Sequence, residues 1–206
     1  MVKKRPKGAR KKFFEIEIPL IATKMHLYGY SPESLEGNVV KLDLTKSLRG
    51  KNLELKAKIK LKGEKLNGEL MSLRLLPSYI KRAMRRGTDY VESSFEVTCK
   101  DAKLRIKPFM ITRKRVSRVV RKAIRNLAKK HLEDKIKSIN TEELFSEIMT
   151  NKLQKELSLK IKKIYPLALC EIRILEVISR LEKTEKPAKE KTEKETKKKE
   201  EDNKEK

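Results

Sequence analysis

Basic side chains form the most distinctive chemical pattern in this sequence. Nine Lys or Arg residues occur between positions 113 and 130, where there is no Asp or Glu. Ten of the fifteen arginines lie between Arg74 and Arg125. A guanidinium is a planar fork that binds two oxygens of one phosphate and stacks on bases, whereas a lysine ammonium acts as a point charge. The pattern therefore favours binding of a polyanion.

A long helix is predicted over residues 116–137, with apolar and basic residues on opposite faces. At 100° per residue one face carries Val116, Val119, Val120, Ala123, Ile124, Leu127 and His131. The opposite face carries Arg118, Arg121, Lys122, Arg125 and Lys129. A solvated helix face usually mixes charges of both signs, but here the first carboxylate is Glu133. We interpret the basic face as a phosphate-binding surface, with a merely solvated face as the alternative.

A shorter predicted helix over residues 79–86, followed by Gly87, repeats this arrangement. Its inner side is formed by Tyr79, Ile80, Ala83 and Met84, and its outward bases are Lys81, Arg82, Arg85 and Arg86. Bases near a helix C-terminus also favour the helix dipole, which is the structural alternative for some of them. Three further bases precede the long helix: Arg113, Lys114 and Arg115.

The N-terminal twelve residues are predicted to form a disordered basic arm that becomes ordered on nucleic acid. They contain no acid and seven bases: Lys3, Lys4, Arg5, Lys7, Arg10, Lys11 and Lys12. Aromatic residues make up only 5% of the chain, so base stacking is not indicated. Recognition through the phosphate backbone and the shape of a folded RNA is expected instead.

The remaining composition limits the class of protein. The chain has 206 residues, a formal net charge of +25 and no apolar run near the length of about 18 residues that a membrane span needs. Residues 180–206 carry eleven bases and nine acids, so this low-complexity Lys/Glu tail adds little net charge and is predicted to be a solvated appendage. One domain is predicted over residues 13–179, in an intracellular protein without a membrane partner.

Hydrophobic periodicity predicts strands first and helices later. Strands are expected over residues 14–18, 39–44, 53–61, 66–76, 90–99, 104–112 and 169–178. Besides the two basic helices, a helix is expected to begin after Asn140 and to break near Thr150. The prediction is an α+β domain with an antiparallel, barrel-like or sandwich-like sheet and flanking helices.

Residues capable of catalysis or metal binding have ordinary structural explanations. His26 is predicted in a loop, and His131 falls on the apolar helix face. Cys99 and Cys170 lie in strand-like runs, where a cysteine behaves as a small apolar residue, and neither belongs to a zinc-type cluster. Glu142 and Glu143 suit a helix start. No nucleotide-binding or hydrolase motif occurs, so neither catalysis nor a cofactor or metal is predicted.

Specific strings resemble a known family. They are Ser31–Leu44 (SPESLEGNVVKLDL), Ser78–Thr88 (SYIKRAMRRGT), Val97–Asp101 (VTCKD) and, most specific, Lys163–Arg173 (KIYPLALCEIR). Over about residues 13–178 their order and spacing resemble the archaeal and eukaryotic small-subunit ribosomal protein family S-one-e, also called S-three-a-e. Thr112–Arg125 resembles the start of the family's basic helix, although Ser117-Arg118 stands where the family has Ser-Gln.

The resemblance implies a non-catalytic ribosomal protein of the cytoplasmic ribosome with a β-barrel-like core. Its expected partners are small-subunit rRNA, neighbouring small-subunit proteins and mRNA near the exit at the subunit platform. Two other hypotheses stay open on the sequence: a nucleoid or chromatin-like DNA-binding protein, which the charge alone allows, and an RNA-modifying enzyme, which needs a cofactor pocket.

Overall fold

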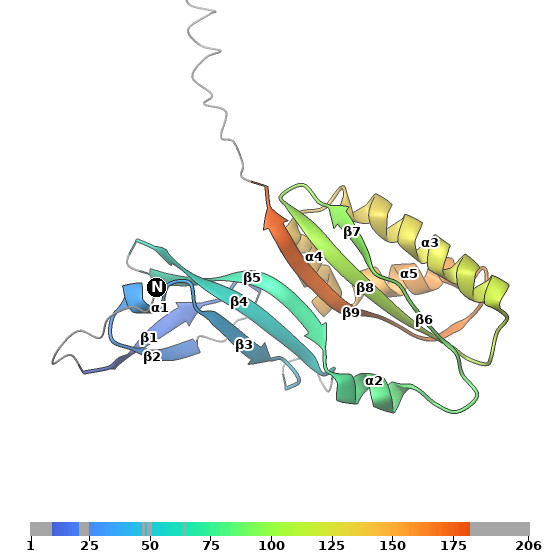
Figure 1. Ribbon diagram of the computed structural model, residues 1–206, viewed down its shortest axis with the longest axis horizontal. Coiled ribbons are helices and arrows are strands. Elements are labelled where there is room, and N and C mark those ends of the chain that lie inside the picture. Colours follow the sequence, from blue (N-terminus) through green and yellow to red (C-terminus); the bar gives the residue numbers. More distant parts are fainter. Residues whose placement is uncertain (1–9, 21–24, 47, 49–50, 64, 182–206) are drawn as a thin grey trace, which may run out of the picture.

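The computed structural model describes residues 10–20, 25–46, 48, 51–63 and 65–181 (Figure 1). Most of the predicted arm and nearly all of the predicted tail lie outside these residues. The predicted arm reaches position 12, but Lys12 is already the first residue of a strand.

Nine strands and five helices occur in the described part of the chain. The strands are β1 (Lys12–Glu17), β2 (Met25–Gly29), β3 (Val39–Asp43), β4 (Leu53–Lys62), β5 (Lys65–Leu75), β6 (Tyr90–Glu92), β7 (Phe95–Thr98), β8 (Ala102–Thr112) and β9 (Leu167–Arg180). The helices are α1 (Pro32–Leu35), α2 (Pro77–Ala83), α3 (Arg118–Ile136), α4 (Thr141–Met149) and α5 (Lys152–Ile161). The α+β prediction is therefore confirmed.

All nine strands join one sheet that does not close. The order β2-β1-β5-β9-β8-β6 forms its main path, with β4 and β3 on the other side of β5 and β7 beside β8. Every pairing is antiparallel except β1 with β5, where Ile16 lies opposite Leu66. β5 pairs with β1 near its start and with β9 near its end. The predicted barrel is not confirmed, because the strands spread along an open, branched sheet.

The hairpin of β4 and β5 follows directly from its sequence. Apolar residues alternate with lysines along β4, and Leu53, Leu55, Ala57 and Ile59 are all buried. Gly63 occupies the connecting turn with φ of 63°, a conformation that glycine adopts at little cost. The predicted strand over 90–99 is instead two short strands, β6 and β7, which both pair with β8.

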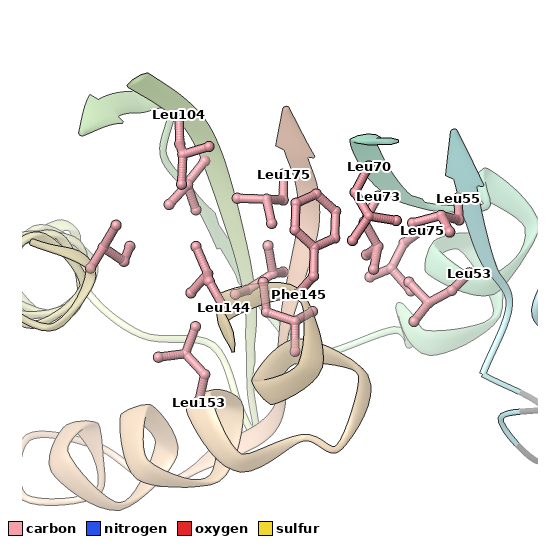
Figure 2. Packing of buried hydrophobic residues seen from close by; sticks show 14 of the residues in the cluster. Leu53, Leu55, Leu70, Leu73, Leu75, Leu104, Leu144, Phe145, Leu153 and Leu175 are labelled. Atoms are coloured by element: carbon pink, nitrogen blue, oxygen red, sulfur yellow. The ribbon is translucent and has the colours of Figure 1, made fainter. Parts of the chain in front are cut away.

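Three helices cover one end of the sheet. Figure 1 shows α3, α4 and α5 against the half that contains β8 and β9, while β1–β4 and α1 lie at the other end of the long axis. In Figure 2, Leu144 and Phe145 of α4 point toward the strands. The cluster continues through Leu73 of β5 to Leu53 of β4, so one hydrophobic core joins both ends of the sheet.

Two helices differ in their boundaries from the sequence expectation, whereas the predicted break near Thr150 is confirmed. α3 begins at Arg118, because Ser117 is its N-cap and accepts a hydrogen bond from the backbone N–H of Val120. α2 spans Pro77–Ala83, so Arg85 and Arg86 follow it rather than belong to it. Asn151, in a left-handed conformation with φ of 61°, separates α4 from α5 near the predicted break.

Three residues lie where the sequence did not place them, and one is Met84, which was predicted on the inner side of the short helix but is 41% exposed and follows α2. His26 is on the strand β2, opposite Glu15, not in a loop. Val119 was predicted on the apolar face of the long helix, but it is 77% exposed. The buried residues of α3 are Ile124, Ala128, His131, Leu132 and Ile136, so burial begins only after the second turn of the helix.

Candidate nucleic-acid interface

A basic cleft brings together two segments that are distant in the sequence. Its volume is about 390 Å³, and its walls include Arg82 of α2, Arg85 of the following turn and Arg113 after β8. The cleft is also lined by Ile111 of β8 and by Ala168 and Leu169 of β9. Three guanidinium groups around one apolar-backed cleft suit an anion with several oxygen acceptors, such as a phosphodiester.

The contact between Asp89 and Thr112 holds the two basic segments side by side. The Thr112 hydroxyl donates to the Asp89 carbonyl over 2.9 Å, and the Asp89 backbone N–H donates to the same hydroxyl over 3.1 Å. The Asp89 carboxylate accepts the backbone N–H of Val116 over 3.0 Å. This carboxylate therefore organises the loop that carries Arg113, Lys114 and Arg115.

The turn between α2 and β6 is ordered by its own hydrogen bonds. Gly87 has φ of 82°, and the Thr88 hydroxyl donates to the Arg85 carbonyl over 2.7 Å. The turn leaves the side chains of Arg85 and Arg86 exposed. Lys81 is exposed on α2, and Arg82 is also exposed while its Nε donates to the Ser78 carbonyl over 3.4 Å.

The bases of α3 form a second surface. Arg118, Lys122, Arg125 and Lys129 are exposed, and Arg121 is partly buried. We call these five residues the α3 stripe. Arg125 is fixed in place because its Nε donates to the backbone carbonyl of Glu92 over 3.2 Å. Lys129 lies 3.7 Å from the Glu133 carboxylate, an exposed pair of little energetic weight.

Only part of the predicted arm can be placed. Arg10, Lys11 and Lys12 are exposed at the start of β1. Lys3, Lys4, Arg5 and Lys7 lie outside the described residues. Figure 1 shows β1 at the opposite end of the long axis from α3. The described residues of the arm, which lie at the start of β1, are therefore distant from the α3 stripe.

The residues interpreted as structural have local explanations in the fold. His131 is buried on α3, and burial lowers its pKa, as do the nearby Lys160 and Lys135. Cys99 is buried and accepts the Ala102 backbone N–H over 3.2 Å. Burial raises the pKa of the partly exposed Cys170 thiol to about 12. The carboxylate of Glu143 accepts the backbone N–H of Asn140, as expected for a helix start.

The described residues contain neither a metal-type cluster of side chains nor a membrane-spanning helix. No three or more His, Cys, Asp or Glu side chains gather there in an arrangement that could hold a metal ion. Within the same residues, no helix has the length and apolar character needed to cross a membrane.

Comparison with known proteins identifies the family. The model of the ribosomal S3Ae family matches residues 2–180, which include the cleft, the α3 stripe and β1. The chain belongs to the ribosomal S3Ae family. This is the family that the sequence strings predicted, and residues 163–173, which carry the most specific string, supply Ala168 and Leu169 of the cleft wall.

Proteins from archaea are among the curated relatives of this S3Ae-family chain. The small ribosomal subunit protein eS1 of Nanoarchaeum equitans is 31% identical over 179 residues, which cover 83% of this chain and 90% of that protein. The protein of the same name from Desulfurococcus amylolyticus is 26% identical over 176 residues, covering 82% of this chain and 83% of the relative.

Sequence reasoning missed the residues that position the cleft. Thr88 ends one family string and Thr112 begins another, so both stood beside the bases that were singled out. Asp89, an acid next to a cluster of arginines, was a further signal. The hydrogen bonds between Asp89 and Thr112 join residues 23 positions apart. Hydrophobic periodicity within one segment cannot predict such a contact.

Proposed function

We propose that this S3Ae-family chain is a structural constituent of the small ribosomal subunit and binds small-subunit rRNA through the basic cleft, the α3 stripe and the N-terminal arm. The observation that carries the proposal is the convergence of Arg82, Arg85 and Arg113 on one cleft. Relatives named small ribosomal subunit protein eS1 support the choice of ribosomal RNA over other polyanions.

The side chains of the cleft and the α3 stripe are better suited to binding the phosphate backbone of RNA than to recognising its base sequence. Their bases are arginines and lysines on exposed surfaces, and phosphate contacts fix position without reading sequence. Two acids of this region have partners within the fold: the Asp89 carboxylate accepts the backbone N–H of Val116, and the Glu92 carboxylate lies 2.5 Å from the Arg173 guanidinium.

The finer parts of the proposal come from the family resemblance. A place at the platform near the mRNA exit, with neighbouring small-subunit proteins and mRNA within reach, is expected for a member of this family in the cytoplasmic ribosome. Crosslinking of assembled subunits with and without mRNA tests these contacts one by one.

Salt-dependent binding tests the main proposal. The full chain is titrated with a small-subunit rRNA fragment and with duplex DNA at several salt concentrations. About eight phosphate contacts give a slope of log K against log salt of about −6 to −7. Affinity is expected to be higher for the rRNA at every salt concentration. Equal affinity for both ligands would instead favour a nucleoid-type DNA-binding protein.

A matched pair of double variants tests the cleft itself. Arg85→Glu with Arg113→Glu is expected to lower affinity for the rRNA at least tenfold. Lys41→Glu with Lys58→Glu makes the same change in net charge at exposed positions on β3 and β4, and is expected to have a much smaller effect. Equal losses for the two variants would show that only net charge matters.

A further inference from the structure

Two aromatic rings lie exposed on the outer face of the β1–β2 pair. Phe13 is 72% exposed and Tyr28 is 55% exposed. They occupy directly opposed positions on the two strands, and their ring centroids lie 5.0 Å apart with the ring planes inclined by 42°. Tyr90 is exposed to a similar degree, at 56%, but its ring pairs with that of the buried Phe109, whereas Phe13 and Tyr28 form a pair of two exposed rings.

The pleat of the strands explains why these rings face outward. Alternate residues point to opposite faces, so Phe14, Ile16 and Leu27 face the interior when Phe13 and Tyr28 do not. The inner face is covered by α1, because a Cβ atom at Gly29 would lie 2.9 Å from the Leu35 side chain. The rings of Phe13 and Tyr28 therefore do not belong to the hydrophobic core.

A cation completes the group. The Lys11 ammonium lies 5.2 Å from the ring centroid of Tyr28 and 5.4 Å from that of Tyr30. We call Lys11, Phe13, Tyr28 and Tyr30 the β1–β2 platform. A lysine over an aromatic ring is attracted by the ring's electron-rich face, which orients the ammonium beside the exposed rings.

The charge around the platform indicates an anionic occupant. Arg10, Lys11 and Lys12 are exposed at the start of β1, and the nine residues before them in the sequence hold four further bases and no acid. Glu15 and His26 come next on the same face and mark its far boundary. Exposed aromatic rings beside cations are the combination that proteins use to stack successive bases of a single strand while binding its phosphates.

We propose that the β1–β2 platform stacks unpaired bases of small-subunit rRNA, as a binding site separate from the cleft and the α3 stripe. The inference rests on the proposed function only in choosing ribosomal RNA as the strand. Figure 1 shows β1 and β2 at the end of the molecule opposite α3, so the two sites contact different parts of one RNA. The platform contributes base stacking, which the sparse aromatic composition alone did not suggest.

The absence of tryptophan from the chain provides a direct test. Phe13→Trp introduces the only tryptophan of the chain into the platform, and its fluorescence can be excited selectively over that of the tyrosines. A ten-nucleotide oligouridylate is expected to quench its fluorescence, while a short RNA duplex, whose bases are already stacked, is not. Leu159→Trp is the matched control, because Leu159 is exposed on α5 at a distance from the platform in sequence and in fold.

Loss of the rings tests their contribution to affinity. Phe13→Leu with Tyr28→Leu keeps apolar bulk on β1 and β2 and is expected to weaken oligouridylate binding at least tenfold. The salt slope is expected to stay unchanged, because Lys11 and the other bases remain. Unchanged affinity in this variant, or equal quenching of Phe13→Trp by single strand and duplex, would overturn the stacking proposal.

Crosslinking identifies the occupant in the assembled particle. Ultraviolet irradiation of small subunits prepared without mRNA is expected to join Phe13 or Tyr28 to an unpaired rRNA nucleotide. Crosslinks of these residues only to another protein, or only after mRNA is added, would overturn the choice of rRNA. If the stacking tests fail while the chain still binds rRNA through the cleft, only the stacking proposal is overturned and the proposed function stands. If the unmodified chain binds no rRNA, the proposed function itself is refuted.

Discussion

The ammonium group of Lys51 lies 2.8 Å from the carboxylate of Glu171, and only 9% and 11% of these side chains are exposed. Lys51 also donates a hydrogen bond to the side chain of Asn151, the residue that separates α4 from α5. Gln154 of α5 donates to the same Glu171 carboxylate over 3.4 Å. This ion pair therefore connects the segment before β4 with β9 and the α4–α5 junction.

The first prediction is that Lys51→Met destabilises the protein strongly. Removing the cation leaves the Glu171 carboxylate buried without its ionic partner, which typically costs about 3–5 kcal/mol. Replacing both members, Lys51→Met with Glu171→Leu, is expected to restore most of the lost free energy of unfolding. Urea unfolding followed by circular dichroism measures all three proteins. If Lys51→Met were as stable as the unmodified chain, the ion pair would contribute nothing to the free energy of unfolding.

The second prediction concerns the close approach of Ile18, the residue after β1, to Gly68 of β5. A Cβ atom at Gly68 would lie 2.7 Å from Cγ1 of Ile18 and 3.5 Å from Cβ of Ala57. Gly68→Ala is therefore expected to reduce the free energy of unfolding by about 1–3 kcal/mol. Ile18→Ala removes the obstructing atom, so the double variant should lose less stability than the sum of the two single losses. Strict additivity in urea unfolding would contradict this close contact.

Local sequence patterns predicted those elements whose burial follows their own periodicity. β4 alternates strictly and was predicted over 53–61, against Leu53–Lys62 in the structure. The long basic helix was predicted over 116–137, against Arg118–Ile136. In both, the apolar spacing of a single segment carries the information.

Features that depend on distant partners were not predictable in this way. The parallel pairing of β1 with β5 joins segments about 50 positions apart, and it is part of the open sheet that replaced the expected barrel. Val119 lies on the helix face that the apolar spacing predicts to be buried, but it is exposed. The spacing identifies the face of the helix and not the turn at which the sheet begins to cover that face. The β1–β2 platform was missed because β2 itself was not predicted.

The third prediction concerns the pH dependence of stability. Burial lowers the pKa of His131 in the folded protein, with Lys160 and Lys135 acting in the same direction and Glu156 opposing them. The unfolded chain therefore binds more protons near its ordinary pKa of about 6.5. Stability is fully present above that value and is lost as the pH falls below it toward the lowered pKa of the folded state.

His131→Leu tests this dependence with little damage to packing, because Nδ1 of His131 has no hydrogen-bond partner among the described residues. The urea midpoint of the unmodified chain is expected to fall between pH 7.5 and pH 5.5, and that of the variant to fall less. Hydrogen bonding with Lys135 lowers the pKa of Glu156, whose effect is lost only as the pH falls below about 4.3, outside this range. Identical pH profiles for both proteins would rule out His131 as the cause.

The last prediction concerns the α3 stripe, and the structure determines which bases to change. Arg125 is bonded to the Glu92 carbonyl and Arg121 is partly buried, so reversing either charge disturbs the fold as well as the surface. Arg118→Glu with Lys122→Glu avoids both problems, since these side chains are exposed. Their loss as phosphate contacts should make the salt slope of rRNA binding shallower by about 1.4–1.8. The urea midpoint should stay unchanged.

Lys152→Glu with Lys155→Glu on the exposed side of α5 gives the matched control, with the same change in net charge. If Arg118 and Lys122 contact phosphates, only the α3 variant changes the slope of log K against log salt. If only the net positive charge matters, both double variants weaken rRNA binding alike. Incorporation into small subunits, followed by sedimentation, should fail for the α3 variant and proceed for the α5 variant. Normal incorporation of both would mean that the α3 stripe is a solvated helix face.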